Sequence, residues 1–73
     1  MLVKFRDDTD IVFLEIDYIR VIREELLIEL YKYDLEDYIL LWSLKLNYAT
    51  HSECLSKIEK YQSGIMDLTG YVQ

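Results

Sequence analysis

Apolar and polar residues alternate along the first half of the chain, a pattern typical of strands with one buried face. In residues 2–6 (LVKFR), Val3 and Phe5 fall on one parity and the basic residues on the other. The DDTD segment that follows has short polar side chains that favour a turn. Residues 11–22 are rich in β-branched side chains, and their apolar parity changes after Tyr18. They predict an extended segment with a bulge or a break inside it.

Residues 26–34 and 38–48 also alternate, and they predict a hairpin that turns across LED. Trp42 falls at the middle of its inner face, where we expect the indole to be the largest single contributor to the core. Large apolar pairs gathered on one face specify a buried sheet surface. The inner pairs expected are Leu26–Leu46, Ile28–Leu44 and Leu30–Trp42, and the outer pairs are Leu27–Lys45, Glu29–Ser43, Tyr31–Leu41 and Tyr33–Ile39.

A helical interpretation of the same region stays open. Glu and Leu are good helix formers, so residues 19–33 could form a helix, and several apolar residues of 35–49 also fall at helical spacing. A helix over 35–49 would leave Leu40, Leu41 and Leu44 spread around its circumference, without a clean apolar stripe. The strand interpretation therefore explains more of the residues.

The segment THSECLSKIEKYQSG predicts a helix over residues 51–63. Thr50 and Glu53 have the spacing of a capping box, in which each side chain bonds a free backbone N–H of the first turn. Gly64 suits the left-handed residue just past a helix end. The apolar stripe of this helix consists of Cys54, Leu55, Ile58, Tyr61 and Ile65.

These elements predict one α+β domain over residues 1–73, a small antiparallel sheet with one helix on one face. The sheet has three to four strands, at about 2–6, 11–22, 26–34 and 38–48. We expect the helix to dock on Trp42 through Leu55 and Ile58. The alternative fold is a mostly α bundle with a short N-terminal β-hairpin.

Composition narrows the classes of partner. Fourteen Asp and Glu against eight Lys and Arg give a formal net charge of −6, which argues against nucleic-acid binding and against a polybasic membrane-surface segment. A single cysteine, Cys54, cannot form an internal disulfide and fits a reducing compartment. No apolar run is long enough for a signal peptide or a membrane span. We expect a soluble, cytoplasmic protein.

Candidate catalytic and metal-binding groups are few. His51 and Cys54 share a helix face and could form a base–nucleophile pair, but a thiol on the apolar stripe is expected to be buried and inert. Asp7, Asp8 and Asp10 lack the glycine and distal glutamate of a calcium loop, and one Cys with one His makes no zinc site. The sequence therefore predicts a protein that is not an enzyme, with no catalytic residues, cofactor or metal.

Seven tyrosines in 73 residues are the main functional signal. Tyrosine has a large apolar body and a polar tip, and it is enriched at protein interfaces. In the predicted register, Tyr31, Tyr33, Ile39 and Leu41 share the outer face of the hairpin, which one helix cannot cover as well as the inner face. We therefore predict a protein–protein interaction or regulatory module that forms a homodimer through this patch.

The alternative function is an acidic inhibitor or nucleic-acid mimic encoded by a mobile element. It rests on the net charge of −6 and on the acidic clusters at residues 7–10, 24–29 and 34–37. Such a protein would have to space its carboxylates like phosphates along one face.

Overall fold

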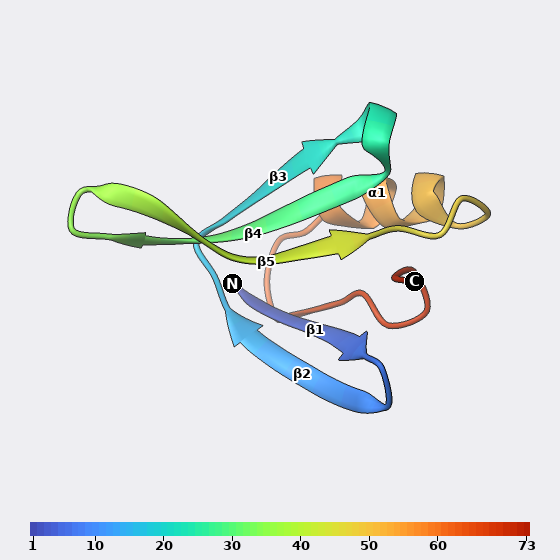
Figure 1. Ribbon diagram of the computed structural model, residues 1–73, viewed down its shortest axis with the longest axis horizontal. Helices are drawn as coiled ribbons and strands as arrows, with labels where there is room; N and C mark the ends of the chain where they lie inside the picture. Colours follow the sequence, from blue (N-terminus) through green and yellow to red (C-terminus); the bar gives the residue numbers. More distant parts are fainter.

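The computed structural model describes residues 1–73 as six strands, one α-helix and one short 3-10 helix (Figure 1). The predicted α+β class is confirmed, and the helical interpretations of 19–33 and 35–49 are wrong, since both segments are extended along most of their length. The elements are β1 (Leu2–Asp7), β2 (Asp10–Glu15), β3 (Tyr18–Ile22), η1 (Arg23–Glu25), β4 (Leu27–Asp34), β5 (Asp37–Lys45), α1 (His51–Glu59) and β6 (Ile65–Asp67).

The strands form two three-stranded sheets rather than one. The first has the order β2-β1-β6, with β1 antiparallel to β2 and parallel to β6, and the second has the order β3-β4-β5 and is antiparallel. The predicted strand 11–22 is interrupted at Ile16 and Asp17, where the chain passes from one sheet to the other. At this crossing the Ile16 N–H donates to the Met1 carbonyl and the Asp17 N–H donates to the Tyr31 carbonyl, both at 2.8 Å.

The core lies between the two sheets, which diverge like a wedge from the β2–β3 crossing (Figure 1). The inner faces of the sheets and α1 contribute to it because their apolar side chains fall at the period of each element, and the segment around β6 adds Met66 and Leu68. Its eleven buried residues are Val3, Phe5, Ile16, Ile28, Leu30, Leu44, Leu46, Cys54, Leu55, Met66 and Leu68.

Trp42 is less central than the sequence predicts. It opposes Leu30 in the sheet as expected, but its side chain is only partly buried. The largest fully buried side chain belongs to Phe5. The two rings meet edge to face with their centroids 5.2 Å apart, so the indole covers one end of the core.

The predicted hairpin register is confirmed between Leu30–Trp42 and Leu27–Lys45. Beyond Leu30 a β-bulge shifts it, so the predicted pairs Tyr31–Leu41 and Tyr33–Ile39 are wrong. The observed pairs are Tyr31–Leu40, Lys32–Ile39 and Tyr33–Tyr38.

The turn of this hairpin consists of two residues that rarely occupy such positions. Leu35 and Glu36 have φ values of 50° and 66°, as a two-residue turn of type I′ requires at both central positions. Asparagine and glycine normally fill these positions because a larger side chain is strained at positive φ. The hairpin is therefore held by its strand pairing and not by a favourable turn sequence.

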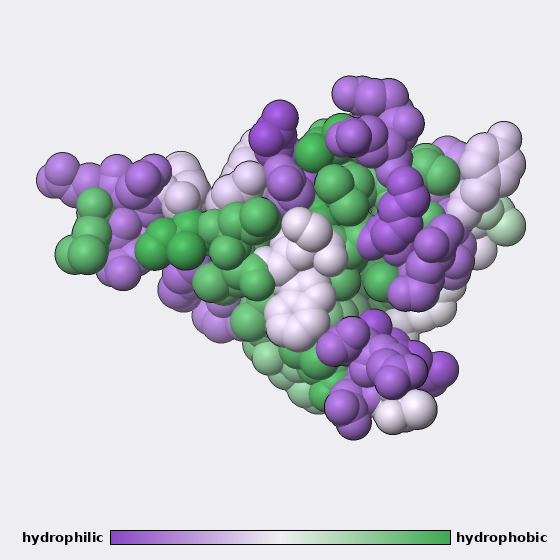
Figure 2. All heavy atoms as spheres, viewed as in Figure 1, coloured by the Kyte–Doolittle hydropathy of each residue, from purple (hydrophilic) through white to green (hydrophobic).

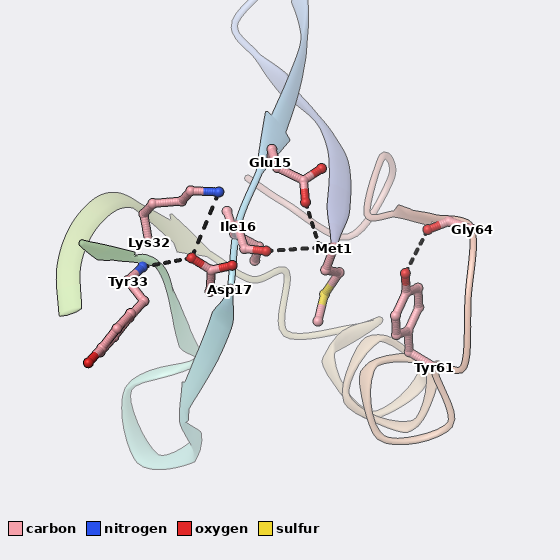
Figure 3. Close-up of polar contacts among 8 residues, drawn as sticks. All are labelled: Met1, Glu15, Ile16, Asp17, Lys32, Tyr33, Tyr61 and Gly64. Carbon is pink, nitrogen blue, oxygen red and sulfur yellow. Dashed lines mark hydrogen bonds and ion pairs between the residues drawn. The ribbon is translucent and has the colours of Figure 1, made fainter. Parts of the chain in front are cut away.

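The helix starts where predicted, with Thr50 as the N-cap, but the predicted capping box is absent. Thr50 makes no side-chain capping bond, and its hydroxyl oxygen is buried without a partner. The helix ends at Glu59 instead of residue 63. Gly64 has the expected positive φ of 85°, but it lies in the turn to β6, where its carbonyl accepts a 2.7 Å hydrogen bond from the Tyr61 hydroxyl (Figure 3).

The C-terminal residues 71–73 lie against the outer edge of β5 where that strand ends. Val72 bridges Leu46, and the N–H groups of Asn47 and Gln73 close the contact with bonds of 2.8 Å to Tyr71 and 2.9 Å to Lys45.

Candidate interaction surface

The distal part of the β4–β5 hairpin, residues 33–41, projects from the body of the molecule and is called here the arm (Figure 1). Beyond the end of β3 it has no third strand beside it. Figure 2 shows hydrophobic side chains along the arm from its tip to the body. Six of the eleven exposed large hydrophobic residues belong to the arm: Tyr33, Leu35, Tyr38, Ile39, Leu40 and Leu41.

Four tyrosines cluster where the arm meets the outer face of the second sheet. Strand pairing places Tyr18 opposite Tyr31 and Tyr33 opposite Tyr38. The Tyr38 ring is the centre of the cluster, with centroid distances of 5.7 Å to Tyr18, 6.4 Å to Tyr31 and 5.1 Å to Tyr33. Aromatic pairs at these separations attract each other beyond their buried area. The cluster stiffens the base of the arm and leaves a broad, half-exposed aromatic surface.

A polar group fixes the inner end of this tyrosine cluster. The Tyr31 hydroxyl donates a 2.9 Å hydrogen bond to Glu29 Oε1, which also lies 3.4 Å from Arg20 Nη1. Because Arg20 and Glu29 oppose each other across β3 and β4, the three side chains form one row. Tyr31 is therefore held in place, while Tyr33 and Tyr38 at the other end are about half exposed.

The structure divides the predicted interface of Tyr31, Tyr33, Ile39 and Leu41. Tyr31 and Tyr33 share the outer face as predicted. Ile39 pairs with Lys32, and since side chains alternate along a strand, it lies on the opposite face. Leu41 is the extra residue of the bulge, without a partner on β4.

The residues that replace Ile39 and Leu41 beside the two tyrosines are Tyr38 and Leu40. The prediction that all four residues share one face is therefore wrong, although all four belong to the arm or its base. Hydropathy could not reveal the bulge, because residues 38–42 are all apolar or aromatic and a shift by one residue leaves the pattern unchanged.

The two edges of the arm differ in their hydrogen bonding. On the β4 edge, Asp17 Oδ2 accepts a 2.7 Å hydrogen bond from the Tyr33 N–H and lies 3.8 Å from Lys32 Nζ (Figure 3). On the β5 edge, the Asp37 carboxylate accepts the Tyr38 N–H at 2.8 Å. From Ile39 to Leu44 the backbone of this edge has no further partner. The C-terminal residues pair with the edge only from Lys45 onward. We call the stretch 39–44 the open edge.

The candidate pair His51 and Cys54 does not have the environment of a reactive thiol. Cys54 is fully buried, and burial raises the pKa of its thiol to about 11, with Lys57 opposing the shift only in part. His51 Nδ1 lies 2.5 Å from the Tyr48 carbonyl oxygen. Next to His51 is an open hollow of about 370 Å³, lined by Arg23, Ser52, Leu55, Ser56 and Glu59. The thiol lies in the core with Leu55, so the two side chains do not form a nucleophilic centre.

The three acidic clusters of the sequence lie at separate turns, except for Glu29, which lies on β4. Asp7 and Asp10 flank the β1–β2 turn, Glu24 and Glu25 lie in η1, and the third cluster, residues 34–37, forms the arm tip. These turns occupy three different corners of the molecule (Figure 1). No three His, Cys, Asp or Glu side chains converge as ligands for a metal ion.

Comparison of the chain with protein-family models, with curated proteins and with solved structures found no match. No helix has the length and apolar character needed to cross a membrane.

Proposed function

We propose that the protein is a small protein–protein interaction module that self-associates through the arm. The observation that carries this proposal is the concentration of six exposed large hydrophobic residues on one projecting hairpin. A contiguous apolar surface on a soluble monomer is costly and marks an interaction site. The tyrosine cluster supports the proposal, because tyrosine is enriched at such sites.

The small size of the domain also supports self-association. Only eleven of 73 residues are buried, and a chain of this length buries a smaller share of its surface than larger domains do. Pairing of two arms would cover apolar surface that the monomer cannot cover by itself. We propose a homodimer that acts as a regulatory or scaffolding component in a reducing compartment such as the cytoplasm, without a nucleic-acid partner, a cofactor or a catalytic role.

The acidic inhibitor or nucleic-acid mimic stays as the second candidate. Its motivation is the formal net charge of −6. The separation of the three acidic turns gives it less support than the arm gives to self-association, since a mimic needs its carboxylates in a row.

Sedimentation velocity at concentrations from about 1 to 100 μM tests the proposal. The wild-type protein is expected to shift from monomer to dimer across this range. A charge on the arm, as in Leu41→Asp or Ile39→Asp, is expected to keep the protein monomeric without changing its circular dichroism spectrum, because the arm lies outside the core.

Ile11→Asp is the matched control. Ile11 and Ile39 are exposed to 45% and 46%, but Ile11 lies on β2, away from the arm. The control is expected to dimerise like the wild type. A wild-type protein that stays monomeric throughout, or a control that dissociates as readily as the arm variants, would contradict self-association through the arm.

A further inference from the structure

The arm presents apolar side chains on both of its faces. Tyr33, Tyr38 and Leu40 lie on the outer face, and Ile39 lies on the opposite one. A partner that docks flat against one face would leave the other exposed. A strand added at the edge of the arm contacts side chains of both faces, because the side chains of paired strands lie beside each other above and below the sheet.

Only one edge of the arm is available to such a strand. On the β4 edge, the Asp17 carboxylate already accepts the Tyr33 N–H. On the β5 edge, the open edge 39–44 has unpaired backbone groups and no charged side chain. Natural proteins usually protect a long edge strand with charges, proline or a β-bulge. This stretch has no charge and no proline, and its one bulge lies at Leu41, so the segment from Trp42 to Leu44 is a regular open edge.

We infer that the open edge of β5 pairs antiparallel with the open edge of a second copy, so that two three-stranded sheets join into one. This inference rests on the proposed self-association and specifies the atoms that produce it. In a dimer with a two-fold axis, the same short stretch of each copy forms the interface. It also brings the acidic tip of each arm, with Asp34, Glu36 and Asp37, toward the Lys45 end of the other β5, where opposite charges meet.

Ser43 provides a backbone group that can be tested. At the end of β5 the Lys45 carbonyl points outward to Gln73, whereas the Leu46 N–H points inward to Leu26. Because successive residues of an antiparallel pair direct their backbone groups alternately inward and outward, the Ser43 N–H and carbonyl face the open edge. In the monomer this N–H has no protein partner.

The test replaces the Ser43 amide N–H by an ester oxygen in a chemically synthesised chain, which can be joined at Cys54. The substitution removes one donor from each copy. Because an ester carbonyl is a weaker acceptor than an amide carbonyl, it also weakens the Trp42 carbonyl, which faces β4 within the monomer. The dimer dissociation constant, measured by sedimentation, is expected to rise by at least about tenfold, because each lost bond is worth about 1 kcal/mol. The midpoint of thermal unfolding of the dilute monomer is expected to fall no more than in the control ester described next, which weakens the Arg20 carbonyl in the same way.

The control is the same ester at Val21. By the same alternation its N–H faces the outer edge of β3, which lies away from the arm. This variant is expected to dimerise like the wild type.

Three outcomes separate this inference from the proposed function. A weakened dimer with the Ser43 ester and not with the Val21 ester supports edge pairing. If neither ester changes a dimer that Ile39→Asp dissociates, the arms meet through their faces, and edge pairing is overturned while self-association stands. A wild-type chain that remains monomeric overturns both.

Discussion

At the scale of single residues, the outcome of a substitution in this protein depends on which face of a strand it occupies. Leu44 is 4% exposed and belongs to the core, whereas its neighbour Ser43 is exposed. The sequence already predicted this distinction, because strict alternation from Trp42 to Leu46 gives one parity to the core. The degree of burial of Trp42 could not be predicted, since it depends on the contact between its indole and the Phe5 ring of the other sheet.

We expect Leu44→Asp to unfold the domain largely and Ser43→Asp to be tolerated. A carboxylate at Leu44 would be buried without a partner, which costs several kcal/mol, whereas one at Ser43 remains in water. Urea unfolding at low protein concentration measures both variants. Equal stability of the two would mean that 42–46 is not a strand with this inner face.

Phe5→Ala is expected to destabilise the protein more than Trp42→Ala. Truncating a fully buried aromatic side chain costs about 3–5 kcal/mol, and Phe5 is fully buried while Trp42 is not. The free energies of unfolding from urea titrations provide the comparison. A larger loss for Trp42→Ala would place the indole, and not the Phe5 ring, at the centre of the core.

Cys54 is expected to make stability fall at alkaline pH. The folded-state pKa of its thiol is raised from 9.0 to about 11 by burial, so folding favours the protonated thiol. Its contribution is complete below pH 9 and is lost as the pH rises from about 9 to 11, where the unfolded thiol ionises first. The loss amounts to about 2 kcal/mol.

Cys54→Ala serves as the reference for this measurement, because the two proteins differ only in the thiol. Its stability is expected to fall less steeply between pH 9 and 11 than that of the wild type, in urea titrations at each pH. Parallel curves for the two proteins would contradict a raised thiol pKa.

At the scale of elements, the sequence predicted the strands well and their arrangement less well. Alternation located the strands because each has one buried face. The change of parity within 11–22 signalled a break, which the structure places slightly earlier, at Ile16 and Asp17, where the chain changes sheets. Strand β6 has only three residues and no periodicity to detect, and its parallel pairing with β1 is a tertiary contact that local pattern does not encode.

The arm, too, could be predicted only in part from the sequence. Two alternating segments around LED predicted the hairpin. They did not predict on which face Ile39 and Leu41 lie, because the bulge falls within a run of apolar residues. Only the packing of Trp42 and Leu44 in the core fixes the register on one side of the bulge, and the two-residue turn fixes it on the other.

Replacing the turn Leu35-Glu36 by Asn-Gly is expected to stabilise the hairpin by about 1 kcal/mol or more. Both residues have positive φ, which costs an ordinary side chain roughly 1–2 kcal/mol, and Asn-Gly favours this turn. Leu35 is 90% exposed, so its removal loses no packing in the monomer. Thermal melts at low concentration should show a higher midpoint, and an unchanged or lower midpoint would argue against this turn geometry.

At the scale of the whole molecule, the two sheets and the helix enclose a small core and leave the arm outside it. The body needs the inner faces of both sheets for its own stability, so the surface free for a partner consists of the outer faces and of the arm with its open edge. The exposed apolar groups concentrate on the arm. Self-association through the arm would therefore add to the fold without rearranging it.

Nuclear Overhauser contacts between an isotopically labelled copy and an unlabelled copy, mixed at high concentration, test this account most directly. We expect intermolecular contacts from the methyl groups of Ile39, Leu40 and Leu41, and none from Ile11. Intermolecular contacts confined to the first sheet, or their absence from the arm of a protein that sediments as a dimer, would contradict the claim that the arm joins the two copies.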